Sequence, residues 1–149
     1  MNNAGKTDVS SLSHQRVADV GQGLWIVFCG RADQPWLRLL RPGFRHCFAA
    51  LRDAQGWLVL DPLSRRLIVA RLDLPAAFDL PRFYARAGMA PLGPFSPGPA
   101  RSSWLPMLTP YSCVALCRQL LGADAPFALT PHGLFHALRD RANEIGKKA

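Results

Sequence analysis

The sequence predicts an α+β fold, in which an antiparallel β-meander packs against a pair of C-terminal helices. Two observations support this prediction: β-forming runs separated by short turn signals fill the first half, and long helical patterns with clear caps appear only near the C-terminus. The chain has 149 residues, 49% of them hydrophobic, enough for one sizeable core but too few for two ordinary domains. We therefore expect a flexible polar leader over residues 1–16 and a single domain over residues 17–149.

The expected strands are short and lie close together in sequence. The first is Gly23–Gly30, an apolar run bounded by glycines and rich in β-formers. Three more follow at Phe44–Leu51, Trp57–Asp61 and Leu67–Leu72, separated only by "RDAQG" and "PLSRR". Such short breaks predict hairpins, so these three runs form the meander. Residues 36–41 fit either a strand or one helical turn.

Three helices are expected, with a proline-rich segment between the first and the second. A short helix begins at Pro81, while residues 88–110 hold six of the 13 prolines and also large apolar side chains, which predicts a packed loop. The second helix runs over Ser112–Leu121 and ends at a glycine. The third begins at Pro131, because Thr130 is a suitable N-cap and proline is favoured at the first helical position.

The charge and the N-terminal sequence limit the classes of partner. The net charge of +8 comes mainly from arginines that are scattered, with no basic run longer than two residues. This favours a solvated basic surface, compatible with a charged ligand or an anionic cell-wall polymer. Nucleic-acid binding stays as an alternative that would weaken steeply with salt. No apolar stretch reaches the roughly 18 residues of a membrane helix, and no secretory signal is visible, so we expect no membrane span and a cytoplasmic or virion-associated protein.

The four cysteines are expected to be reduced, and one of them is placed for chemistry. Cys113 falls in the first turn of its helix, directly after Ser112, where the helix dipole favours a thiolate. The other three fit core positions: Cys29 ends a buried strand, Cys47 lies within a strand, and Cys117 lies one helical turn after Cys113.

A histidine and a carboxylate on neighbouring strands complete a possible nucleophile, base and orienting group. If "RDAQG" closes a hairpin in which Arg52 pairs with Trp57, Asp61 lies opposite Phe48 and diagonal to His46 on the same face. Diagonal neighbours are about 7–8 Å apart at the backbone, within reach of their side chains. These are the three roles of a cysteine hydrolase.

The order of these residues resembles that of the circularly permuted papain-like (NlpC-type) superfamily of bacterial and phage cysteine peptidases and amidases. The segments that carry the resemblance are "RHCFAALRDAQGWLVLDP", "PYSCVALCRQLLG" and "LTPHGLFHAL". The resemblance covers about Phe44 to Leu138. It implies an antiparallel sheet packed on the cysteine helix, and acyl transfer or hydrolysis at an amide, thioester or ester through a covalent thioester. We expect the substrate to be a peptide-type amide, such as a cell-wall peptide, and we expect no cofactor or metal. Cys113 would be the nucleophile, His46 the base and acid, and Asp61 the orienting group. The backbone N–H of Cys113 would bind the oxyanion, with Gln22 as the side-chain candidate.

Three other interpretations remain open from the sequence. A phage or prophage assembly or adaptor protein could keep this fold without catalysis. Asp61, which precedes Pro62, could simply start a turn. The pairs Cys113-x3-Cys117 and His132-x3-His136 approach the spacing of a zinc site, although both pairs lie in helix patterns. His14 fits a solvated position in the leader, and the two helix histidines fit surface or half-buried positions.

Overall fold

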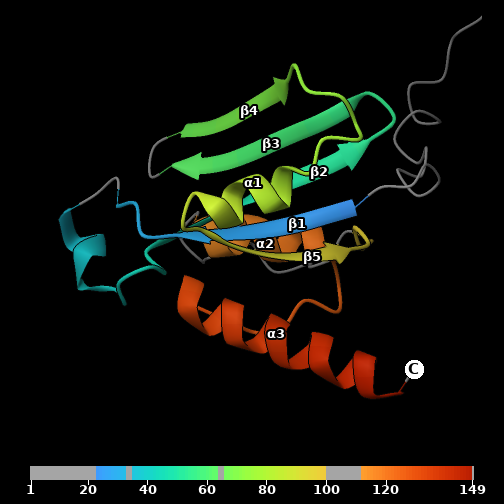
Figure 1. The fold of residues 1–149 in the computed structure, drawn as a ribbon. Helices are drawn as coiled ribbons and strands as arrows, with labels where there is room; N and C mark the ends of the chain where they lie inside the picture. Colours follow the sequence, from blue (N-terminus) through green and yellow to red (C-terminus); the bar gives the residue numbers. More distant parts are fainter. Residues whose placement is uncertain (1–22, 33–34, 64–65, 100–111, 149) are drawn as a thin grey trace, which may run out of the picture.

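In a computed structural model, residues 23–32, 35–63, 66–99 and 112–148 are described. They form an α+β fold with one five-stranded antiparallel sheet in the order β4-β3-β2-β1-β5 (Figure 1). The strands are β1 (Gly23–Cys29), β2 (His46–Asp53), β3 (Gly56–Leu63), β4 (Arg66–Leu72) and β5 (Ala90–Phe95). The helices are the 3₁₀ helix η2 (Pro35–Leu39), α1 (Leu80–Arg86), α2 (Cys113–Leu121) and α3 (Pro131–Lys148). The α+β class and the meander of β2, β3 and β4 are as expected.

The hairpin between β2 and β3 has the predicted register. Arg52 pairs with Trp57 and Asp53 with Gly56, which leaves a two-residue turn. Gly56 has a positive φ of 112°, and a Cβ there would lie 2.6 Å from the carbonyl oxygen of Leu74, so glycine is required at this position. Because this turn fixes the pairing, it also fixes which β3 residues lie near the start of β2.

Helices cover both faces of the sheet, and each face has its own core. Alternation along β1 and β2 sends Ile26 and Ala49 to the face covered by α2 and α3 (Figure 1). Ala50 on the other face packs with Trp57 and with Leu80 of α1. The indole N–H of Trp57 donates a hydrogen bond to the carbonyl of Phe78 at 3.0 Å, which satisfies the polar atom of this buried ring. The sheet is therefore the middle layer of three.

The expectation of a loop throughout residues 88–110 is wrong for its first part. Residues 90–95 form β5, which pairs with β1. Proline cannot donate a backbone hydrogen bond, but β5 is an edge strand with only one neighbour, so Pro91 and Pro94 are tolerated there. Residues 100–110 of that segment and the expected leader lie outside the described part of the chain. The ambiguous run at 36–41 overlaps the 3₁₀ helix η2, so a helical turn and not a strand forms there.

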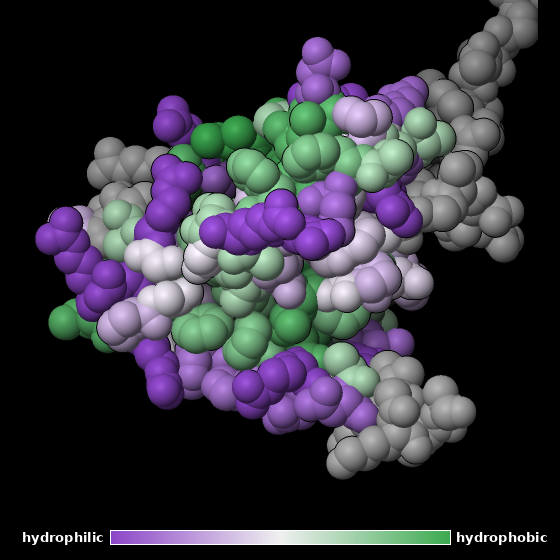
Figure 2. All heavy atoms as spheres, in the orientation of Figure 1, coloured by the Kyte–Doolittle hydropathy of each residue, from purple (hydrophilic) through white to green (hydrophobic). Residues whose placement is uncertain are grey.

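The opposite edge of the sheet exposes apolar side chains. Leu67, Ile68 and Val69 of β4 are all partly accessible, and Figure 2 shows apolar surface over this upper part of the molecule. Among the helices of the described ranges, none has the length and apolar character needed to cross a bilayer.

Candidate active site around Cys113

Cys113 is the first residue of α2, and the local sequence explains why the helix begins there. Ser112 has an extended backbone, with φ −133° and ψ 160°, and its Oγ accepts a hydrogen bond from the N–H of Ala115 at 3.1 Å. This is the geometry of a serine N-cap. Gly122, with φ 82°, ends the helix as expected. Cys113 therefore lies at the positive end of the helix dipole, half-buried, with its thiol free.

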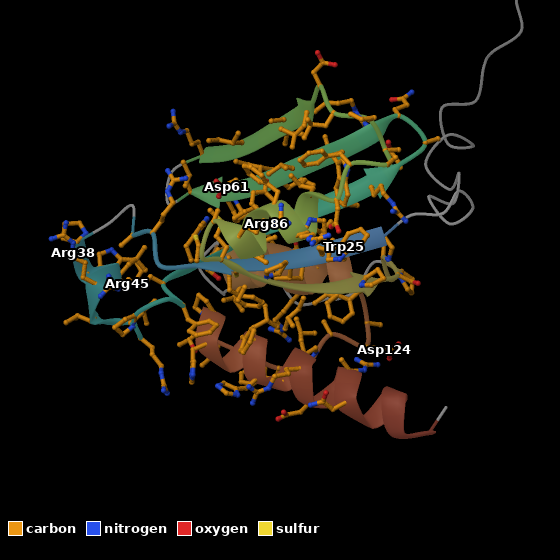
Figure 3. The ribbon with its side chains drawn as sticks, in the orientation of Figure 1. Trp25, Arg38, Arg45, Asp61, Arg86 and Asp124 are labelled. Carbon is orange, nitrogen blue, oxygen red and sulfur yellow. The ribbon has the colours of Figure 1, made fainter. Side chains whose placement is uncertain are left out.

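His46 and Asp61 meet as the hairpin register requires. The Nε2 atom of His46 lies 2.6 Å from Oδ1 of Asp61, and the two side chains are only 8% and 21% exposed. Asp61 is part of β3, so the alternative in which it only starts a turn before Pro62 is wrong. Figure 3 shows Asp61 on the same side of the molecule as Arg38 and Arg45, and far from Asp124.

The start of β2 brings two neighbours to Cys113. Along the strand, Cys47 belongs with Ala49 to the core beneath α2, whereas His46 lies on the side of Phe48, toward α1. His46 is the first residue of β2, and at this strand end both it and Cys47 lie close enough to Cys113 to shift its pKa. The expected base and the expected nucleophile are thus electrostatically coupled.

These neighbours make Cys113 an acidic thiol. A hydrogen bond from the Cys47 side chain has the largest effect; burial opposes it, and hydrogen bonds from His46 and from the backbone of Cys47 add to it. Together they lower the pKa of Cys113 from 9.0 to about 5. The thiolate is therefore the main form of Cys113 at neutral pH, and the thiolate is the nucleophilic form.

The same contacts keep His46 protonated. Burial lowers the pKa of the imidazole, but the hydrogen bonds to Asp61 and Cys113 outweigh burial and raise the pKa from 6.5 to about 10. Because Nε2 bonds to Asp61, Nδ1 is the ring nitrogen left for Cys113. Between about pH 5 and pH 10, the site is a thiolate–imidazolium pair with a carboxylate behind the imidazolium.

The exposed side of the histidine–aspartate pair borders a small pocket of about 70 Å³. It is lined by Arg31, Ala32, His46, Asp61 and Leu63. The guanidinium of Arg31 lies beside the His46–Asp61 pair, so the edge of this pocket would favour an anionic or strongly polar group. From α1, Tyr84 packs edge-on against Phe48, and burial together with the charge of Asp61 raises the pKa of its hydroxyl.

The remaining predicted residues separate into two groups. Gln22 and His14 lie outside the described residues. Cys29, Cys47 and Cys117 are buried, and His132 and His136 are half-buried, as expected.

For the alternative zinc arrangement, the described residues contain no group of three or more His, Cys, Asp or Glu side chains that could hold a metal ion. The two helix histidines instead bond to each other, with Nε2 atoms 2.9 Å apart.

Sequence reasoning missed the part that Cys47 plays. Its thiol was expected to be a core residue, which is correct, but the core it joins is the one against which Cys113 packs. The pKa of Cys47 is raised well above its ordinary value, mainly by its hydrogen bonds to Cys113 and Cys117 and by burial, so it stays protonated and donates. The alternation of β2 placed Cys47 on the opposite face from His46, but it carries no signal of which face α2 covers.

Comparison of the chain with known protein families, with curated proteins and with solved structures finds no match.

Proposed function

We propose that this protein is a thiol-dependent hydrolase or amidase of the permuted papain-like type, which cleaves a peptide-type amide through a thioester on Cys113. The observation that carries the proposal is the electrostatic coupling of Cys113 to His46, whose Nε2 bonds to Asp61. A preformed ion pair of this kind supplies both a nucleophile at neutral pH and a proton for the leaving group.

The reaction follows from these positions. The Cys113 thiolate attacks the amide carbonyl, and the oxyanion is stabilised by the backbone N–H of Cys113 at the start of α2, where no intrahelical acceptor competes. The imidazolium of His46 gives its proton to the departing amine. The neutral imidazole then takes a proton from water, which attacks the thioester and releases the acid. Asp61 holds the ring in one orientation and stabilises its charged form.

The basic surface supports an anionic substrate class. The net charge is +8, and Arg31 borders the pocket beside His46. A peptide with carboxylate side chains or a free C-terminus, such as a cell-wall stem peptide, combines the amide bond with the charge that this rim would attract.

The test is acylation and turnover on the full chain. Peptide amides and muropeptides are incubated with the native protein, and the reaction is followed by product release and by intact mass. We expect a transient acyl adduct on Cys113 and turnover that Cys113→Ala abolishes, whereas Cys29→Ala, which removes a thiol from the other face of the sheet, retains it. Turnover that is unchanged in Cys113→Ala, or the absence of both adduct and turnover across the substrates, would overturn the proposal and favour an assembly or adaptor role.

A further inference from the structure

Three of the four cysteines form one cluster, and the proposed hydrolysis needs only one of them. The Sγ atoms of Cys47 and Cys117 are 3.8 Å apart, and Cys113 packs against the same core and interacts with the Cys47 side chain. Cys47 is therefore the central thiol, in contact with both others. Cys113 and Cys117 are four residues apart on α2, so they lie on the same side of the helix, facing β2.

The three thiols differ in access and in ionisation. Cys47 and Cys117 have no exposed surface, whereas Cys113 is half-buried at the helix start. A small oxidant reaches Cys113 first, and Cys113 is also the thiol held as a thiolate, the form that reacts with peroxides. The protonated Cys47 behind it is shielded from direct oxidation but touches the sulfur that would be oxidised.

We propose that Cys47 is a resolving cysteine for Cys113, so that peroxide converts the site into a Cys47–Cys113 disulfide, which Cys117 can then exchange for a Cys47–Cys117 disulfide. The Sγ atoms of Cys47 and Cys117 are in van der Waals contact at 3.8 Å, and side-chain rotation has to bring each bonded pair to the roughly 2.0 Å of a disulfide. Both partners lie on elements that already pack together, β2 and α2.

The steps balance with a hydroperoxide as oxidant. The Cys113 thiolate attacks the terminal oxygen, the O–O bond breaks, and the alkoxide or hydroxide leaves with a proton from the His46 imidazolium. Cys113 is then a sulfenic acid. The sulfur of Cys47 attacks it, a disulfide forms, and the hydroxyl group leaves with the Cys47 proton as water. Two electrons from the two thiols reduce one peroxide.

Exchange with Cys117 restores the nucleophile. The sulfur of Cys117 attacks Cys47, the bond between Cys47 and Cys113 breaks, and Cys113 leaves as a thiolate. The Cys117 proton is taken up by the neutral imidazole of His46. The oxidation is thereby moved into the buried pair, and the thiolate–imidazolium pair is formed again without an external reductant. The cluster would protect Cys113 from irreversible oxidation to a sulfinic acid.

The test uses the full-length reduced protein and stoichiometric hydrogen peroxide, with no substrate, so its result is independent of the proposed hydrolysis. Trypsin releases Cys47 within residues 46–52, and Cys113 together with Cys117 within residues 102–118. Non-reducing mass spectrometry detects the link between these two peptides, and fragmentation assigns its partner. We expect this intramolecular link, the loss of two thiols per peroxide that dithiothreitol reverses, and a Cys113 that can still be alkylated once the disulfide has moved to Cys47 and Cys117.

Variants separate the two steps. Cys117→Ala should stop at the Cys47–Cys113 link, with Cys113 protected from alkylation until dithiothreitol is added. Cys47→Ala should accumulate sulfinic acid at Cys113, which dithiothreitol does not reverse, whereas Cys29→Ala should behave as the native protein. If Cys47→Ala does not fold, Cys117→Ala still decides the matter. Sulfinic acid at Cys113 of the native protein without any 46–52 to 102–118 link, or links only between molecules, would overturn the proposal.

Discussion

The Nε2 atom of His46 lies 2.6 Å from Oδ1 of Asp61, although the two residues are diagonal rather than opposite in the β2–β3 hairpin. This contact commits one nitrogen of the ring and leaves Nδ1 for the thiol of Cys113. It also raises the pKa of His46, and the imidazolium in turn lowers that of Cys113. The pH behaviour of the thiol is therefore linked, through the imidazole, to the carboxylate of Asp61.

Removing the imidazole should make Cys113 a slower nucleophile in mildly acidic solution. In the native protein, alkylation of Cys113 should increase as the pH rises through about 5, well before the other three thiols react. In His46→Ala, the imidazolium is lost and the pKa of the thiol rises, so less thiolate is present at about pH 6 and alkylation should fall. The fall should be only roughly tenfold, because the more basic thiolate is intrinsically more reactive. Site-by-site mass spectrometry after timed alkylation measures all four thiols at once.

The buried Cys29 is the internal reference for that experiment. If Cys113 reacts as slowly as Cys29, or if His46→Ala leaves its pH profile unchanged, no thiolate–imidazolium pair exists in solution. The proposed hydrolysis would then have no activated nucleophile.

Asp61→Asn should lower the pKa of His46 without removing the ring. An amide keeps the size of the carboxylate and can still accept a hydrogen bond, but it no longer carries the charge that stabilises the imidazolium. We expect the ring to titrate below the native value of about 10, as seen from the His46 signal in an NMR pH series. Turnover of any substrate should also fall in Asp61→Asn, by at most the roughly 10²–10⁴-fold that a general base contributes.

Asp53→Asn is the matched control for this change. Asp53 is also a strand carboxylate, but it pairs with Arg71 on the surface, with Oδ2 2.8 Å from Nη2. Removing the charge of Asp53 should leave the pKa of His46 unchanged. An equal shift in both variants would mean that general surface charge, and not the 2.6 Å contact, sets the pKa of His46.

The site geometry could be predicted as far as local rules reach. The "RDAQG" turn and the period of two residues along a strand were enough to place Asp61 diagonal to His46, and Ser112 and Gly122 were enough to delimit α2. These features depend on residues close in sequence. Their geometry is set by turn closure and by capping rather than by the rest of the fold.

The placement of α2 and the existence of β5 depend on tertiary structure. Alternation shows that His46 and Cys47 point to opposite faces, but not which face receives α2, so the contact between Cys47 and Cys113 was not visible from the sequence. Likewise, the prolines of residues 90–95 indicate a loop unless the strand lies at an edge with a single neighbour. Which strand is at the edge is decided only when the whole sheet assembles.

The ion pair should also appear in the stability of the fold. The folded pKa of Cys113, about 5, is below its ordinary value of 9.0, so the thiolate contributes stability that is fully present above pH 9 and is lost as the pH falls through about 5. The native protein should therefore lose unfolding free energy relative to Cys113→Ser as the pH is lowered toward about 5. Urea denaturation of both proteins across that range measures the difference, and parallel curves would contradict the lowered pKa.

Ser112→Ala should both loosen the start of α2 and weaken the acidity of Cys113. Loss of the hydrogen bond to the N–H of Ala115 should cost about 1 kcal/mol of stability. Thr130→Ala removes the equivalent 3.1 Å cap hydrogen bond to Gly133 at the start of α3, so it should cost a similar amount. Only Ser112→Ala should move the alkylation profile of Cys113 to higher pH. A shift in both variants would attribute the effect to general loss of stability.

Arg31 should make the site selective for negatively charged reagents. It lines the pocket with His46 and Asp61, and its guanidinium should attract a carboxylate to the surroundings of His46, the partner of Cys113, whereas a neutral reagent of the same size gains nothing from it. The ratio of alkylation rates with iodoacetate and iodoacetamide isolates this charge effect, because both reagents transfer a substituted methyl group to the same sulfur. Arg31→Ala should lower the ratio several-fold at low ionic strength, and added salt should reduce the difference. Arg141→Ala removes the same charge from α3, where Arg141 binds the carbonyl of Asp124, and should leave the ratio unchanged. If the two variants change the ratio equally, the basic surface as a whole attracts anions, and Arg31 has no special part in recognising a substrate.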